Sequence, residues 1–163
     1  MSDRVPIIVV DTSVFLDILL DNPERVEDAL ELLRGHGSKH LVAIPAIQEL
    51  EFCALAKLES GDMTDSARIS AKKAYYANAL DWLSAQSYMS IEVNRSIVRR
   101  AAEIWGSSLV RRADAAMVAS AEYVQASALY TYDEKLIRHV SSIDPKVPVR
   151  MPPTTGALPI PAM

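Results

Sequence analysis

The sequence predicts an α/β protein of three layers, in which a central, mostly parallel five-stranded sheet is flanked by helices on both faces. Short apolar segments alternate with amphipathic helical segments along the chain, and this order is typical of parallel strands joined by helical crossovers. The first apolar segment, residues 5–10, is continuous and rich in β-branched side chains. Such a run indicates a strand that is covered on both faces.

The element boundaries follow from apolar periodicity and from the residues that start or stop helices. Five strands are predicted, at residues 5–10, 41–44, 89–93, 127–131 and 147–150. Seven helices are predicted, at residues 12–20, 24–34, 45–59, 65–85, 95–109, 114–123 and 134–140. Pro23 separates the first two helices, Pro45 suits the first turn of the third, and Asn94 caps the fifth.

Length favours a single domain. With 163 residues the chain buries a sizeable core but leaves little room for a second one. Residues 1–150 are the predicted domain, and residues 151–163, with four prolines, are a tail expected to be extended or disordered. Removing the tail after Arg150 should then leave the melting temperature nearly unchanged.

Cysteine content and hydropathy favour a reducing compartment. The single cysteine, Cys53, excludes an internal disulfide, which suits the cytoplasm. The first residues lack the features of a signal peptide, and no apolar run reaches the length of a membrane span. We therefore expect a cytoplasmic protein with no membrane partner.

The charge balance limits how the chain could bind nucleic acid. A formal net charge of −4 at pH 7 argues against binding through overall positive charge. A local basic patch is still compatible with it, and three arginines are candidates for contacts to phosphate: Arg99, Arg111 and Arg112. The alternative for each arginine is a solvated helix face.

Acidic residues lie where predicted strands give way to helices, which is where doubly wound sheets bind ligands. Asp11 follows the first strand, and Asp133 follows the fourth. Asp114 opens an alanine-rich helix, and Glu49 lies one turn into the helix after the second strand. Each aspartate alone is explained as a helix N-cap. Together the acids would repel one another, and a divalent cation would relieve that cost. Oxygen ligands without His or Cys favour Mg²⁺ or Mn²⁺.

Four segments, in order, resemble the successive motifs of the PIN-domain nucleases: IVVDTSVFLDIL, IPAIQEL, ADAAMVASA and LYTYD. The resemblance spans about residues 7–149, and the chain is similar in length to the VapC-type toxin ribonucleases of toxin–antitoxin systems. It implies a Rossmann-like (PIN-like) sheet, an acid cluster that binds Mg²⁺ or Mn²⁺, and hydrolysis of RNA phosphodiester bonds. It further implies the toxin of a type II pair, with an antitoxin as protein partner.

The resemblance also assigns residues. The implied catalytic and metal-binding acids are Asp11, Glu49, Asp114 and Asp133, with Thr12, Ser13 and Thr131 as polar support. Glu51 stays a rival to Glu49, because side chains two residues apart point to different sides of a helix. A symmetric homodimer is the expected assembly.

Two other functions compete with the nuclease. One is a catalytically silent PIN-like module that binds RNA or a protein partner, against which the intact acid set argues. The other is a phospho-aspartate protein with Asp11 as acceptor. A phosphatase of the haloacid-dehalogenase kind expects a second aspartate two residues on, where this chain has Ser13.

Overall fold

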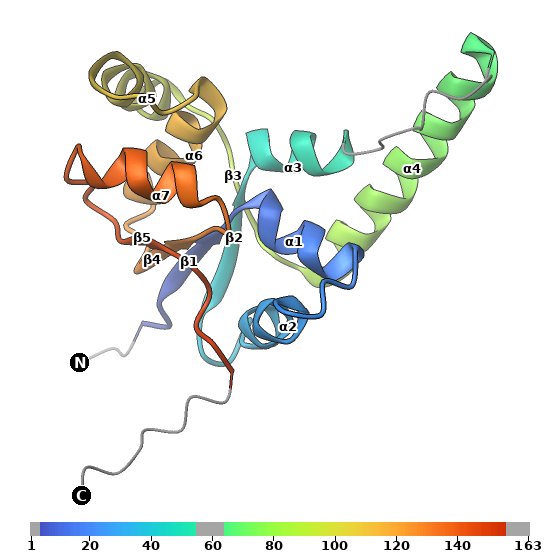
Figure 1. Cartoon of the computed structure of the whole chain (residues 1–163), viewed down its shortest axis with the longest axis horizontal. Coiled ribbons are helices and arrows are strands. Elements are labelled where there is room, and N and C mark those ends of the chain that lie inside the picture. Colours follow the sequence, from blue (N-terminus) through green and yellow to red (C-terminus); the bar gives the residue numbers. More distant parts are fainter. Residues whose placement is uncertain (1–3, 55–63, 156–163) are drawn as a thin grey trace, which may run out of the picture.

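The computed structural model describes residues 4–54 and 64–155. Their centre is a parallel five-stranded sheet in the order β3-β2-β1-β4-β5 (Figure 1). The strands are β1 (Ile7–Val10), β2 (Leu41–Pro45), β3 (Met89–Ile91), β4 (Ala128–Tyr130) and β5 (Val149–Arg150). The predicted fold class is confirmed, and every strand pair of this sheet is parallel.

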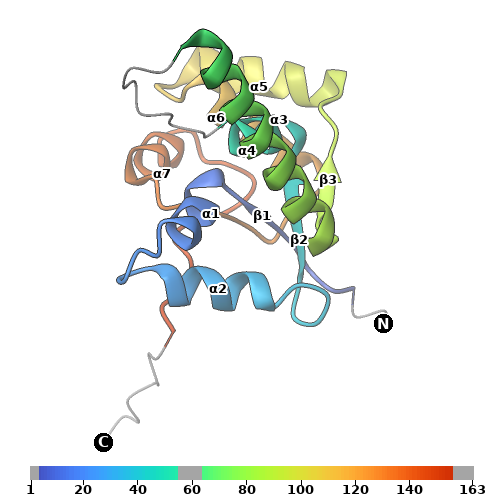
Figure 2. The ribbon, with the colours of Figure 1, turned by 90° about the vertical axis from the view of Figure 1, so that its right-hand side faces the viewer.

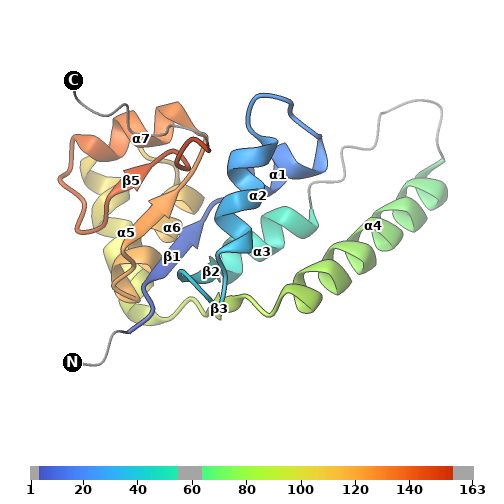
Figure 3. The same ribbon diagram turned by 90° about the horizontal axis from the view of Figure 1, so that it is seen from below.

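Seven helices in the described ranges cover the sheet. They are α1 (Thr12–Leu19), α2 (Val26–Arg34), α3 (Ala46–Cys53), α4 (Asp65–Gln86), α5 (Arg95–Ser107), α6 (Arg112–Tyr123) and α7 (Glu134–Ser141). Figures 1 and 3 show α1 to α4 on one side of the sheet and α5 to α7 on the other. Among the described residues, no helix is long and apolar enough to cross a membrane.

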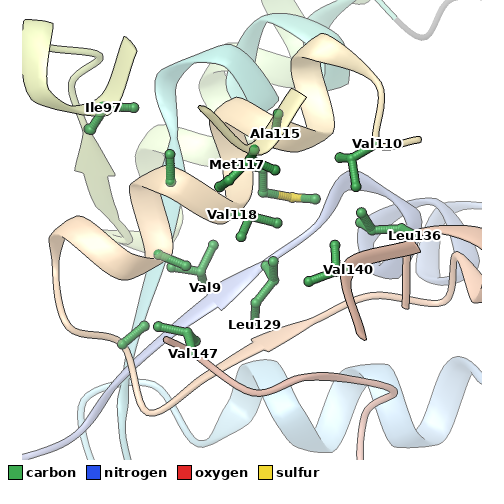
Figure 4. Packing of buried hydrophobic residues seen from close by; sticks show 14 of the residues in the cluster. Val9, Ile97, Val110, Ala115, Met117, Val118, Leu129, Leu136, Val140 and Val147 are labelled. Carbon is green, nitrogen blue, oxygen red and sulfur yellow. The ribbon is translucent and has the colours of Figure 1, made fainter. Parts of the chain in front are cut away.

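Alternate side chains of the central strands build two cores, as the two-residue period of a strand requires. Val9 of β1 and Leu129 of β4 point toward α5, α6 and α7, where they join Met117 and Val140 (Figure 4). Their neighbours in sequence, such as Ile8, join the core beneath α1 to α4. Because both faces are covered, the three central strands β1, β2 and β4 are apolar along their whole length.

Helix α4 differs from the others in how little of it is buried. Ala79 is its one buried residue, and the helix extends away from the body toward its amino-terminal end (Figures 1 and 3), so that in Figure 2 it crosses in front of α3. Its carboxyl-terminal half is anchored by Trp82, whose ring packs edge-on against Phe15 at 5.8 Å between centroids. The preceding helix, α3, ends at Cys53 instead of residue 59, and residues 55–63 lie outside the described part of the chain.

The first residues of the predicted tail run over α2 as an extended segment (Figure 1). Pro152 is buried, and the backbone N–H and the hydroxyl of Thr155 both donate to Oδ1 of Asp28, at 2.5 and 2.7 Å. These contacts tie residues 151–155 to the domain, while residues 156–163 lie outside the described part.

Candidate active site

Four carboxylates from four separate segments of the chain line one cavity of about 210 Å³. It lies at the carboxyl ends of β1 and β4, where parallel strands of an open sheet expose their ligand-binding edge. The lining residues are Asp11, Ser13, Glu51, Arg111, Ala113, Asp114 and Asp133. The three predicted aspartates are therefore brought together, although more than a hundred residues separate the first from the last.

Asp11 occupies the N-cap position of α1 but does not cap it, because its side chain accepts no backbone hydrogen bond there. Its Oδ2 accepts hydrogen bonds from the hydroxyls of Ser13 and Thr131, each at 2.7 Å. Asp11 is only 8% exposed. A buried carboxylate held by two hydroxyls is positioned by the fold, and helix capping does not explain it.

Ser13 and Thr131 also hold the backbone around the site. The Ser13 hydroxyl accepts from the N–H of Tyr132 at 3.0 Å, and the Thr131 hydroxyl accepts from the N–H of Asp133 at 3.0 Å. Both hydroxyls therefore couple Asp11 to the segment that carries Asp133. These two residues lie where polar support was predicted.

Asp114 and Asp133 face a single cation, the guanidinium of Arg111. Its Nε donates to Oδ2 of Asp114 at 3.1 Å, and its Nη2 donates to Oδ2 of Asp133 at 3.2 Å. Asp133 does cap a helix, since its other oxygen accepts from the N–H groups of Lys135 and Leu136 at the start of α7. Asp114 lies in the first turn of α6, which begins at Arg112, two residues earlier than predicted.

The fourth acid that lines the cavity is Glu51, the rival to Glu49 in the sequence analysis. Glu49 lines a different cavity, beside Leu80, Leu83 and Tyr88. Two residues advance an α-helix by about 200°, so the two glutamates point to nearly opposite sides of α3.

Four carboxylates lie close together in the cavity, so negative charges repel one another there. Burial raises the pKa of Glu51, and the nearby charges of Asp11 and Asp114 raise it further. Burial also raises the pKa of Asp114, against the lowering effect of Arg111. One guanidinium therefore does not neutralise the four carboxylates, and the cavity favours an additional cation.

This fold agrees with the family comparison. The family model described as PIN domain matches residues 8–141. The chain belongs to the PIN-domain family. No curated protein matches it in sequence.

Solved structures of similar fold extend over most of this PIN domain. A toxin–antitoxin complex from Klebsiella pneumoniae has 18% identity and a TM-score of 0.57, covering 85% of this chain and 93% of its own. VapC20 of Mycobacterium tuberculosis, a sarcin-ricin loop cleaving toxin, has 16% identity and a TM-score of 0.60, covering 84% and 95%. VapBC2 of Rickettsia felis, bound to a promoter DNA fragment, has 16% identity and a TM-score of 0.59, covering 88% and 96%. At these identities the likeness concerns the fold.

The carboxylates of the acid cavity are chemically suitable ligands for a metal ion, but they are not arranged as a metal site. Among residues 4–54 and 64–155, no group of three or more His, Cys, Asp or Glu side chains is placed to hold a metal ion. Carboxylate oxygens nevertheless suit Mg²⁺ or Mn²⁺, and Mg²⁺ usually binds through one or two carboxylates while keeping several waters. The donor set therefore fits such a cation, which would compete with Arg111 for Asp114 and Asp133.

Gln48 is a site residue that the sequence analysis missed. It is 1% exposed, and its Oε1 accepts from the backbone N–H of Thr12 at 3.1 Å and from the Thr12 hydroxyl. Thr12 therefore faces Gln48 and not the acids. Gln48 also favours the ionised form of Glu51, opposing the rise in its pKa. The available signal was the spacing, because a polar residue three positions before Glu51 lies on the same side of the helix.

The three candidate arginines end up in different places. Arg111 reaches the acids, whereas Arg112 lines a separate cavity with Trp105 on α5. Arg99 is exposed on α5 and lines neither cavity. The structure thus brings one of the three to the site.

Proposed function

We propose that this PIN domain is a Mg²⁺- or Mn²⁺-dependent ribonuclease that hydrolyses RNA phosphodiester bonds. The observation that carries the proposal is Asp11, a buried carboxylate at an N-cap position that caps nothing and shares its cavity with three other acids. Burying carboxylates together is costly, so the arrangement is best explained by a positively charged partner that the cavity binds.

Each residue of the cavity has a role in that proposal. Asp11, Glu51, Asp114 and Asp133 would hold the metal, with the Asp11 carboxylate oriented by its two hydroxyl donors. A bound divalent cation supplies Lewis acidity toward phosphoryl oxygens and lowers the pKa of the attacking water. The pKa of Glu51 is raised by burial and by the neighbouring acids in the metal-free cavity, and a cation held there would lower it again, which suits Glu51 to the role of a metal ligand.

The biological role that we propose is the toxin of a type II toxin–antitoxin pair. The support is the likeness in fold to proteins described as toxins or as toxin–antitoxin complexes. An antitoxin partner, an RNA substrate, a homodimer and a cytoplasmic location belong to the same proposal. The silent RNA- or protein-binding module is the second candidate, and Arg111, which already occupies two of the acids, favours it.

Cleavage by the purified full-length chain, freed of any partner, tests the proposal. Total RNA incubated with Mn²⁺ or Mg²⁺ should be cut, and chelation of the metal should stop the reaction. Asp11→Asn should abolish cleavage with the fold intact. Asp21→Asn is a matched control, because Asp21 is exposed beyond the end of α1 and its φ of 48° suits asparagine.

Calorimetry separates the two candidates. The nuclease should bind Mn²⁺, and Asp11→Asn should weaken that binding at least tenfold. Wild-type protein that retains RNA in Mn²⁺ without cutting it would instead support the silent module. Absence of both Mn²⁺ binding and cleavage would contradict the metal-dependent nuclease.

A further inference from the structure

A second cavity, of about 260 Å³, adjoins the acids. Its lining residues are Leu109, Val110, Arg111, Asp114, Asp133, Lys135, Leu136 and His139. It shares Arg111, Asp114 and Asp133 with the acid cavity, so the two cavities lie side by side. An extended ligand bound across the acids would also reach this second cavity.

The second cavity differs from the first in its charge. Lys135 and His139 lie four residues apart on α7 and therefore share one face of that helix. Within the described part of the chain, neither side chain makes a hydrogen bond or an ion pair. Both are thus available as donors, whereas the guanidinium of Arg111 on the other wall is held by Asp114 and Asp133.

The remaining lining is apolar. Leu136 and Val110 are buried beneath the cavity, and Leu109 is 80% exposed at its rim. An exposed leucine beside two unpaired donors matches a ligand that presents an anionic group together with a flat, weakly polar surface. A nucleotide has this combination in its phosphate and its sugar and base.

We propose that this cavity is a nucleotide subsite, in which Lys135 and His139 bind the phosphate next to the one that undergoes hydrolysis. The inference rests on the proposed function. Single-stranded RNA carries one phosphate per nucleotide, so a strand with one phosphate at the acids must place the next beside them. Lys135 and His139 supply the donors at that place, and Leu109 contacts the sugar or base.

Binding of a fluorescein-labelled single-stranded RNA of mixed sequence tests the subsite. Anisotropy is measured in EDTA, which prevents metal-dependent cleavage, over a range of salt concentrations. Lys135→Gln should weaken binding about three- to tenfold and reduce the slope of log K against log salt by about 0.7, the value for one phosphate contact on a single strand. His139→Gln should weaken binding by a smaller factor, and the double variant should combine both losses.

Arg138→Gln is the matched control. Arg138 lies on the same helix and carries the same charge as Lys135, but it lines neither cavity. Its substitution should leave affinity and salt slope within twofold of the wild type. If Lys135→Gln and Arg138→Gln weaken RNA binding equally, α7 contributes to binding only through its overall charge. That result would overturn the subsite proposal.

Metal-dependent cleavage keeps the two proposals apart. In the subsite variants KM should rise severalfold while kcat changes less than twofold, and calorimetric Mn²⁺ affinity should match the wild type. Wild-type protein that neither binds Mn²⁺ nor cuts RNA defeats the proposed function, whatever the anisotropy shows. Wild-type cleavage with unaltered KM in both variants defeats the subsite alone.

Discussion

The hydroxyl of Thr131 donates a hydrogen bond of 2.7 Å to the Asp11 carboxylate across 120 residues of sequence. It joins the ends of two neighbouring parallel strands, β1 and β4, at the point where both enter the site. Thr131 is completely buried, so this contact is shielded from water. The acid that we regard as central therefore depends on a residue of a distant segment for its orientation.

Thr131→Val should remove that hydrogen bond while keeping the shape of the side chain. It leaves the N–H of Asp133 without its acceptor and Asp11 with one hydroxyl donor, at a cost of about 1–3 kcal/mol in the free energy of unfolding. Urea denaturation measures this loss, and cleavage should fall with it. Thr131→Ser keeps the hydroxyl and should retain most of the cleavage; equal losses in both variants would point to packing.

Glu51→Gln and Glu49→Gln should have different effects on metal binding. The two substitutions are chemically identical, but only Glu51 lines the cavity of the aspartates. We expect Glu51→Gln to weaken Mn²⁺ binding and cleavage about tenfold or more, and Glu49→Gln to leave both nearly unchanged. Calorimetry with Mn²⁺ decides the matter, and the reverse result would restore Glu49 as the site glutamate.

The contribution of Asp114 and Glu51 to the stability of the metal-free protein should fall as pH rises above the ordinary carboxyl values. The pKa of Asp114 is raised from 3.8 and that of Glu51 from 4.5, in both cases chiefly by burial. The folded state therefore holds protons that the unfolded chain has already lost, and this contribution to stability disappears as pH rises through the raised values. Glu51→Gln should make the decline shallower.

The measurement is the free energy of unfolding in EDTA at several pH values, compared between wild type and Glu51→Gln. The carboxyls outside the acid cavity cancel in the difference between the two proteins, which reports on Glu51 and on the acids coupled to it. A difference that is independent of pH would mean that Glu51 titrates alike in the folded and unfolded states. Saturating Mn²⁺ should abolish the decline in the wild type.

Arg111→Gln should tighten Mn²⁺ binding severalfold. The guanidinium pairs with Asp114 and Asp133, which a metal would need. Its side chain is 77% exposed, so removing the pairs should cost less than about 1 kcal/mol of stability. Calorimetry measures the affinity, and Arg112→Gln, at the neighbouring position outside this cavity, is the control. Weaker Mn²⁺ binding would show that Arg111 supports the metal site.

Removal of residues 151–163 should lower the melting temperature by a few degrees, whereas the sequence alone predicts almost no change. It exposes the contacts of buried Pro152 and deletes the two hydrogen bonds from Thr155 to Asp28, together about 1–2 kcal/mol. A chain that ends at Thr155 keeps both contacts and is the control. Equal melting temperatures for the two truncations would show that these contacts contribute nothing.

Much of the fold could be predicted because its signals are local. The β-branched run that became β1, the cap at Asn94 and the alanine-rich segment of α6 each specify their own element. The alternation of strands and helices then fixes a parallel sheet, whose strand ends meet at one edge. This is why Asp11 and Asp133 could be expected to converge.

What the sequence by itself determined, then, was the element order and the edge at which the acids gather. The tertiary structure decided which residues of that edge face one another. Helix α3 carries glutamates on nearly opposite sides, so only its packing against α1, α4 and α6 turns Glu51 toward Asp11 and Glu49 away. The position of Arg111 between Asp114 and Asp133 likewise depends on how two separate helix starts approach each other. Periodicity specifies the faces of one helix, but their orientation in the molecule depends on packing against other elements.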